Sequence, residues 1–259
     1  MEREVQEKLA RSLTASSLEI LPYLPYLLQD LWELGSNPVD IVQVAKGLGA
    51  GPGWKVLDLG CGKGAVGIRL ARETGCSVKG YDLMDGFIEV ARTKAEEWGV
   101  AHRCRFEVQD LHQAVRTEKD HDLTILGAVG SVLGDPGQTL RKLKDTVRPG
   151  GSLIVDDGYI LEGVDAPRLD GEYWTRDAWT RAFQDAGLKL LSELRAGEEI
   201  QSVNDDNTAA IAARAAELAQ LHPERRALFA EYVASQQREC EDMADRVVSA
   251  MWVLEVEAR

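Results

Sequence analysis

A glycine-rich segment constrains the fold of this chain more than any other feature of its sequence. The stretch VLDLGCGKGAVGIRLA places an apolar run with one acidic residue directly before glycines at positions 60, 62, 64 and 67. A short apolar run predicts a buried strand, and clustered glycines predict a tight turn. The segment therefore predicts a strand that turns through a glycine-rich loop into a helix, an arrangement that commonly holds a nucleotide.

The residues that follow continue an alternation of strand and helix. Strand patterns occur in KVLDLG, SVKGYD, RCRFEVQD, HDLTILGA and GGSLIVDDGY, and a helical pattern follows each of the first four. Such alternation predicts a parallel sheet covered by helices on both faces. The 259 residues are enough for one large α/β domain with additions.

Two segments fall outside this alternation. Residues 1–50 have a helical pattern, broken by prolines at 22 and 25 and restarted at Ser36-Asn37-Pro38, and we expect them to form an N-terminal helical lid segment. Residues 51–259 form the second predicted unit. After a helix closed by Gly187 and the strand pattern LKLLSELR, it contains a helical insertion at about 205–247, before a last strand in MWVLEVEAR. The insertion carries an apolar stripe at helical spacing, formed by Phe229, Val233, Gln236, Cys240, Met243 and Val247.

The glycine pattern fits more than one nucleotide. A Walker triphosphate loop is excluded, because Lys63 is followed by Gly64 where that loop needs Ser or Thr, and the preceding spacing is wrong. A dinucleotide site fits, since the loop satisfies GxGxxG. Asp58 favours another ligand, because a carboxylate is unfavourable beside a pyrophosphate but favourable beside the sulfonium and ammonium of S-adenosylmethionine.

Further acidic residues stand at the ends of the next two predicted strands. Asp82 ends SVKGYD, 22 positions after Gly60, where a carboxylate can accept hydrogen bonds from the ribose hydroxyls of either NAD or S-adenosylmethionine. Asp110 and Leu111 follow the third strand, where a carboxylate can accept a hydrogen bond from the adenine amine. We therefore expect three acidic strand ends to face one adenosyl ligand.

These motifs resemble those of the class I S-adenosylmethionine-dependent methyltransferases, especially the small-molecule branch of that family. VLDLGCGKG matches the first motif in full, GYDLMDGFIEVAR resembles the second and FEVQDL the third, while HDLTILGAVGSVLGD and LKDTVRPGGSLIVDD resemble the fourth strand and the approach to the fifth. The resemblance covers residues 54–196. It implies a doubly wound, Rossmann-like, seven-stranded and mostly parallel sheet whose last strand is antiparallel.

The resemblance also implies roles for individual residues in cofactor binding. It assigns Gly60 and Gly62 to the methionine and ribose part of the cofactor, Asp82 to the ribose, Asp110 and Leu111 to the adenine, and Gly127 to the methionine end. Leu83 is a further expected cofactor-binding residue. Asp58 is implied to orient the loop or to meet the ammonium group.

Methyl transfer to a small molecule makes few demands on catalytic side chains. It is an in-line displacement with a neutral leaving group, so a general base is needed only when the acceptor must lose a proton. Ligands bind at the carboxyl ends of strands in such sheets. Asp157 and Tyr159 follow the fifth strand, and we predict them as a base or an acceptor clamp, although a loop cap and a packing residue fit the same positions. Aromatic residues that could either wall the substrate or form lid core are Tyr23, Tyr26, Tyr173 and Trp174.

Composition argues against several classes of partner. A net charge of −13 is unsuited to broad contact with nucleic acid, which needs a basic face. No apolar run approaches the roughly 20 residues of a membrane span. The segment MEREVQEKLARSL lacks the apolar core of a secretion signal, so a cytoplasmic protein is expected. The four cysteines and four histidines have no metal-ligand spacing, and no metal is expected.

The sequence therefore predicts an S-adenosylmethionine-dependent methyltransferase that acts on a small-molecule acceptor through oxygen, nitrogen, carbon or sulfur. Two alternatives stay open. An NAD(P)-dependent oxidoreductase or epimerase explains the glycines and Asp82 but not Asp58, and a catalytically silent module would bind S-adenosylmethionine without turnover.

Overall fold

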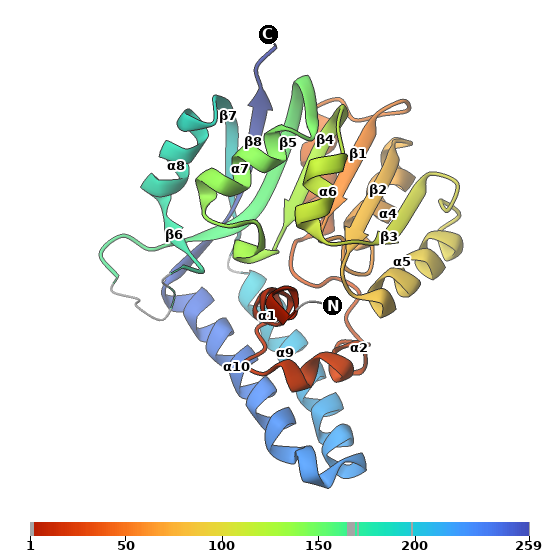
Figure 1. Ribbon diagram of the computed structural model, residues 1–259, viewed down its shortest axis with the longest axis vertical. Coiled ribbons are helices and arrows are strands. Elements are labelled where there is room, and N and C mark those ends of the chain that lie inside the picture. Colours follow the sequence, from red (N-terminus) through yellow and green to blue (C-terminus); the bar gives the residue numbers. More distant parts are fainter. Residues whose placement is uncertain (1–2, 165–168, 170, 198, 259) are drawn as a thin grey trace.

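One hydrogen-bonded sheet forms the centre of the molecule (Figure 1). The computed structural model describes residues 3–164, 169, 171–197 and 199–258. Its strands are β1 (Lys55–Leu59), β2 (Ser77–Asp82), β3 (Cys104–Val108), β4 (His121–Gly127), β5 (Val147–Ile160), β6 (Trp174–Thr175), β7 (Leu188–Arg195) and β8 (Val247–Val256). They follow the order β3-β2-β1-β4-β5-β8-β7, and β6 pairs with the end of β5.

The directions of the strands confirm the predicted fold class. β1 to β5 pair in parallel, whereas β8 runs antiparallel to both β5 and β7. The seven strands of the main path are therefore mostly parallel with an antiparallel last strand, as the sequence predicts. β6 is an addition whose two residues are too few to produce a periodic signal.

Helices cover both faces of the sheet, which makes it doubly wound. The helical elements are α1 (Arg3–Ser12), η1 (Leu18–Tyr23), α2 (Leu24–Leu27), α3 (Pro38–Gly47), α4 (Ala65–Thr74), α5 (Asp85–Glu97), α6 (Leu111–Thr117), η2 (Gly130–Leu133), α7 (Pro136–Lys144), α8 (Arg176–Asp185), α9 (Glu199–Leu221), η4 (Pro223–Arg225) and α10 (Arg226–Asp245). Side chains of α6, α7 and α8 form one core with the sheet, and those of α3, α4 and α5 form another. The first core is centred on Trp252, whose ring lies 4.6 Å from that of Trp179.

Local start and stop signals explain the boundaries of several helices. Asn37 accepts a hydrogen bond from the Val39 N–H at 2.9 Å, and Pro38 occupies the first helical position of α3. Gly187 follows α8 with a φ of +61°, a conformation that favours glycine. Pro22 lies within the 3-10 helix η1 and Pro25 stands at the start of α2, so the prolines divide the helical pattern as predicted.

The predicted helical insertion is the pair α9 and α10, which we call the arm. In Figure 1 the arm extends away from the edge of the sheet at which the parallel strands end, and α1 and α2 lie between the arm and the sheet. A third hydrophobic core joins η1 and α2 to the arm and includes Leu24 and Phe229. The prediction that Val247 completes the helical stripe is wrong, because α10 ends at Asp245 and Val247 begins β8.

Candidate functional site

The glycine-rich loop between β1 and α4 forms one side of a pocket at the carboxyl edge of the sheet. The φ angles of Gly60, Gly62 and Gly64 are +73°, +51° and +77°, a region that side chains with a Cβ rarely adopt. A Cβ at Gly60 would lie 2.4 Å from Val129, and a Cβ at Gly62 would lie 3.2 Å from Leu34. The glycines therefore allow both the turn and the close approach of its neighbours.

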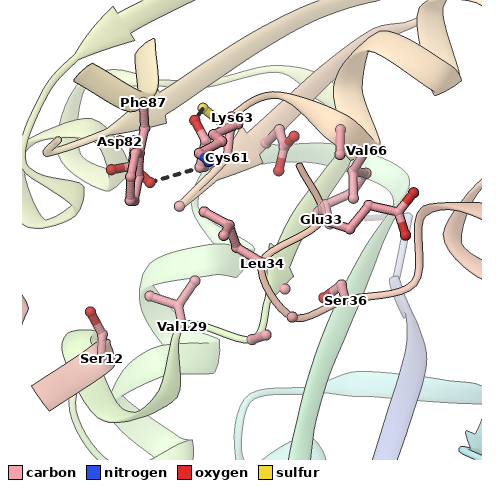
Figure 2. Close-up of a pocket in the computed structure, with 18 of the residues that line it drawn as sticks. Ser12, Glu33, Leu34, Ser36, Cys61, Lys63, Val66, Asp82, Phe87 and Val129 are labelled. Carbon is pink, nitrogen blue, oxygen red and sulfur yellow. Dashed lines mark hydrogen bonds between the residues drawn. The ribbon is translucent and has the colours of Figure 1, made fainter. Parts of the chain in front are cut away.

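Asp82 holds this loop through its carboxylate. Its Oδ2 accepts a hydrogen bond from the Gly62 N–H at 2.9 Å, and its Oδ1 accepts one from the Met84 N–H at 2.9 Å. Figure 2 shows the first of these bonds where Asp82 faces the pocket. Burial raises the pKa of Asp82, and the backbone N–H donors oppose this change. Three backbone N–H groups, those of Gly62, Leu83 and Met84, act on a carboxylate with about four lone pairs, so it can still accept a bond from a ligand.

Asp58 lies beneath the same loop and also lines the pocket. Its side chain is only 3% exposed, and within the described residues its Oδ2 has no hydrogen-bond partner. Burial raises the pKa of Asp58 to about 7, with a further contribution from the Asp82 carboxylate, while the Gly67 N–H lowers it. A buried carboxylate oxygen without a partner is costly, so this atom is a candidate to meet a donor or a positive charge on a ligand.

The pocket spans about 760 Å³, a space that includes open solvent. Gly127, Ala128 and Val129, where β4 ends, contribute part of its wall. A Cβ built on Gly127 would lie 2.4 Å from the Ser36 hydroxyl oxygen, so this glycine permits close contact with the N-terminal segment. The predicted residues Asp58, Gly60, Gly62, Asp82 and Gly127 are thus brought together in one pocket.

The predicted adenine-side residues occupy the neighbouring strand ends. Asp110 caps α6 by accepting a hydrogen bond from the His112 N–H at 2.6 Å. The Gln109 N–H donates to the Asp82 carbonyl at 3.0 Å, which brings the end of β3 against the end of β2. Leu83 and Leu111 flank these positions, but neither they nor Asp110 belong to the pocket wall formed by the described residues.

The two predicted catalytic residues lie on β5, and neither belongs to the same wall. Burial raises the pKa of Asp157 to about 7, while the Gly158 N–H, which donates to Asp157 at 2.7 Å, lowers it. Tyr159 is 5% exposed and belongs to the core around Trp252, 6.2 Å away between ring centroids. Its placement is that of a packing residue, so a role for Tyr159 in the reaction stays a prediction without support from this geometry.

The aromatic residues near the arm also pack against protein. Tyr23 lies edge-on to the ring of Phe229 at 5.0 Å, and the Tyr26 hydroxyl donates to Glu217 at 2.6 Å. The Tyr173 hydroxyl donates to the sulfur of Met243 at 3.4 Å, and Trp174 packs against the Trp252 core. Tyr23, Tyr26 and Tyr173 therefore each contact a residue of the arm.

The structure adds pocket residues that the motifs do not mark. Leu9, Ser12 and Leu13 from α1 and its end line the pocket, and so does the segment 32–36 before α3. Figure 2 shows Leu34 between the glycine-rich loop and Val129. Lys63, within the loop, is 3% exposed. The sequence marks Lys63 only by its place between Gly62 and Gly64, where its long side chain needs contacts from elsewhere in the chain.

Searches for a metal site and for a membrane span found neither in the described part of the chain. No three His, Cys, Asp or Glu side chains there are placed to hold a metal ion. No helix there is both long and apolar enough to cross a bilayer.

Comparison with known proteins gives a match across the strands that build the pocket. A family model described as a methyltransferase domain matches residues 50–187, just over half of the chain. Methyltransferase GfsG of Streptomyces halstedii is 32% identical over 135 residues, which are 51% of this chain and 47% of that protein. A ubiquinone biosynthesis O-methyltransferase of Aeromonas salmonicida is 31% identical over 119 residues, 46% of this chain and 49% of that protein. The chain thus spans about half the length of these curated relatives.

A solved structure extends the likeness to the whole fold. An S-adenosylmethionine-dependent methyltransferase of Geobacter sulfurreducens, crystallised with S-adenosylhomocysteine, superposes with a TM-score of 0.72. The alignment covers 84% of this chain and 90% of that chain at 21% identity. At this identity the likeness establishes the fold and leaves ligand and reaction to be argued from the pocket.

Proposed function

This chain belongs to the class I S-adenosylmethionine-dependent methyltransferase family, and from that premise we propose that it transfers a methyl group from S-adenosylmethionine to a small-molecule acceptor. The observation that carries the proposal is the pair of buried carboxylates, Asp58 and Asp82, beside the glycine-rich loop. The Asp58 carboxylate would repel a pyrophosphate, whereas the two carboxylates together suit a ligand with a positive end and a ribose.

The residues of the pocket fit the cofactor by three separate features. Asp58 offers a buried oxygen without a partner among the described residues, Asp82 keeps a lone pair for a ligand, and the glycines keep Cβ atoms out of a turn that Val129 and Leu34 approach closely. We assign Asp82 to the ribose hydroxyls, Asp58 to the loop and the ammonium group, and Gly60, Gly62 and Gly127 to close backbone contact. Asp110 and Leu111 are proposed for the adenine side, and Leu83, next to the end of β2, is proposed as a further cofactor contact.

The cofactor supplies an activated methyl carbon for in-line displacement when it is bound. The protein's own contribution is to orient the acceptor and to exclude water. The N-terminal segment supports this role, because α1 and residues 32–36 line the pocket directly. Where the acceptor carries a proton that must leave, we propose Asp157 of β5 as the base; it lies outside the pocket wall formed by the described residues, and burial raises its pKa to about 7.

Ligand binding by the whole chain tests the cofactor assignment. S-adenosylhomocysteine is expected to raise the melting temperature and to give a measurable Kd by calorimetry, whereas NAD is expected to do neither, because its pyrophosphate would lie beside the Asp58 carboxylate. Stabilisation by NAD and none by S-adenosylhomocysteine would overturn the proposal. A metabolite screen with S-adenosylmethionine labelled in its methyl group then tests turnover, and binding without transfer to any acceptor would favour a silent binding module.

A further inference from the structure

Lys63 is a buried lysine in the middle of the glycine-rich loop. Its Nζ donates to the main-chain carbonyls of Leu28 and Leu31, at 2.5 and 2.6 Å, and lies 5.6 Å from the centre of the Phe87 ring. Burial lowers the pKa of Lys63 to about 8, while the Asp30 carboxylate favours the charged form, so the group is an ammonium at neutral pH. A buried ammonium is tolerated only when its protons are accepted, which makes these two carbonyls structurally important.

A second hydrogen bond joins the same two segments in the opposite direction. The Trp32 indole Nε1 donates to the main-chain carbonyl of Lys63 at 3.0 Å. Residue 63 therefore both donates to and accepts from the segment 28–32. A segment held by bonds of both directions to one residue has little freedom to slide or rotate against the loop.

The wall of the pocket continues directly from this anchored segment. Residues 32–36 line the pocket, with Leu34 against Gly62 and Ser36 against Gly127. If the anchor at Leu28–Trp32 is released, the wall that follows it in the chain loses its fixed position. The loop on which we propose that the cofactor binds is thus also the loop that holds one wall of the acceptor space.

The opposite side of the anchored segment is tied to the arm. Arg214 of α9 forms two bonds with the Asp30 carboxylate, at 2.6 and 2.9 Å, and also contacts Glu217. Asp30 and Arg214 keep 42% and 29% of their side-chain surface exposed, and ion pairs at such positions are weak. The buried contacts of Lys63 are therefore the stronger of the two attachments.

We propose that Lys63 is a positioning residue that holds residues 28–36 against the glycine-rich loop, and so couples occupancy of the loop to the position of the pocket wall. This inference rests on the proposed function for its second half, the coupling to the cofactor. Lys63 itself contacts backbone carbonyls and need not touch the reacting atoms. Removal of its ammonium should free the wall and leave the sheet and the glycine turn in place.

Hydrogen exchange of the ligand-free protein tests the anchor. The amides of Leu28, Gln29 and Leu31 are hydrogen bonded within the segment and so report its opening. Lys63→Met is expected to speed their exchange by about tenfold or more and to leave β1 and β2 unchanged. Lys63→Arg, which keeps the charge and the donors, is expected to restore slow exchange. Lys46→Met is the control, because Lys46 is an exposed lysine paired with Glu73.

Three results decide against the anchor. Unchanged exchange in Lys63→Met would overturn it, and so would equal acceleration throughout the sheet, which would make Lys63 a general stabiliser. If Lys63→Met fails to fold, Trp32→Phe removes the reciprocal bond while keeping an aromatic ring against Trp98. Faster exchange at Leu28–Leu31 in that variant supports the anchor, and unchanged exchange overturns it.

S-adenosylhomocysteine is the probe for the coupling. It is expected to slow exchange of the segment in the wild type and to have no such effect in Lys63→Met, with both proteins compared at saturating ligand. Equal slowing in both proteins would overturn the coupling. Failure of the wild type to bind S-adenosylhomocysteine would instead refute the proposed function, and the ligand-free comparison would still decide whether Lys63 holds the wall.

Discussion

Asp82 shapes the glycine-rich loop and is also the residue that we propose for the ribose, whereas the sequence motif indicates only the second role. Its two oxygens accept the Gly62 and Met84 N–H groups, so the carboxylate shapes the glycine-rich loop before any ligand arrives. The same group is our candidate for the ribose hydroxyls. A substitution at Asp82 is therefore expected to disturb both the loop and the ligand contact.

Replacing Asp82 by Ala is expected to weaken S-adenosylhomocysteine binding by about tenfold to a few hundredfold, because charge-assisted hydrogen bonds contribute roughly 1.5–3 kcal/mol each. The affinity of Asp82→Asn should fall between those of the wild type and Asp82→Ala. Its amide oxygen accepts one bond, but its NH₂ group faces one of the two N–H donors. Calorimetry measures the affinity and circular dichroism checks the fold. Asp85→Ala, an exposed carboxylate three residues away, is the control. A folded Asp82→Ala protein with unchanged affinity would place the ribose elsewhere.

Replacing Asp58 by Asn is expected to stabilise the folded protein above pH 7 and to weaken binding of S-adenosylmethionine. Burial raises the pKa of Asp58 from its ordinary 3.8 to about 7, so between these values the folded state binds more protons than the unfolded state. Linkage then requires wild-type stability, relative to Asp58→Asn, to fall across this pH range by up to about 4 kcal/mol and to stay constant above it.

Urea unfolding of the wild type and Asp58→Asn at pH 4 and pH 8 measures this difference. The two proteins should be closer in stability at pH 4, where the carboxyl is protonated in the folded wild type. An Asn variant that is less stable than the wild type at pH 8 would show that the ionised carboxylate is a net stabilising group, contrary to its buried and partly unpartnered position.

At the scale of elements, the sheet could be predicted because its strands are buried. β4 is buried nearly throughout, and its apolar residues Leu123, Ile125 and Leu126 give a short strand signal between helical patterns. The first and last residues of the helices were harder to predict. α9 begins at Glu199, before the predicted 205, because its first residues, EIQSVNDDN, have little apolar periodicity to mark the start of a helix. Val247 fits a helical spacing by coincidence, since the same position begins a buried strand.

The contacts of α1 explain how the N-terminal segment is held over the pocket. Ser235 donates to the Thr14 carbonyl at 2.6 Å, and Gln236 donates to the Leu13 carbonyl at 3.3 Å, so the end of α1 is fixed to α10. Leu9, Ser12 and Leu13 then face the pocket. We therefore propose that α1 lies on the acceptor side of this pocket.

Deletion of residues 1–13 is therefore expected to reduce turnover more than cofactor affinity, because it exposes the acceptor space to water and leaves the glycine-rich loop intact. The Kd for S-adenosylhomocysteine should change by no more than a few fold, whereas kcat with an acceptor found in the labelled screen should fall at least about tenfold. The milder variant Leu9→Ala should act in the same direction, and Glu7→Ala, on the exposed side of α1, should have no effect. Unchanged kcat after the deletion would assign α1 to packing alone.

At the scale of the whole molecule, the site divides into a half that the sequence predicts and a half that it does not. Asp58, Gly60, Gly62 and Asp82 stand in or beside short motifs at strand ends, where the topology of a parallel sheet brings them together. The wall formed by α1 and residues 32–36 depends on contacts between residues far apart in the sequence, such as that of Lys63 with Leu28. No local pattern encodes such a pairing, because it follows from how the N-terminal segment packs between the arm and the sheet.

The net charge of −13 leads to a prediction that involves the whole surface. S-adenosylmethionine carries one net positive charge at neutral pH, whereas S-adenosylhomocysteine, which lacks the sulfonium, carries none. The field of an acidic protein should therefore speed the association of the first ligand and not of the second, and salt should screen this effect over a Debye length of about 10 Å at 0.1 M. Raising the salt concentration from 20 to 500 mM is expected to lower the association rate of S-adenosylmethionine about three- to tenfold, and that of S-adenosylhomocysteine by less than about twofold. Stopped-flow binding measures both rates on the same protein. Equal salt dependence for the two ligands would mean that local contacts at the pocket, and not the charge of the whole molecule, govern the capture of the cofactor.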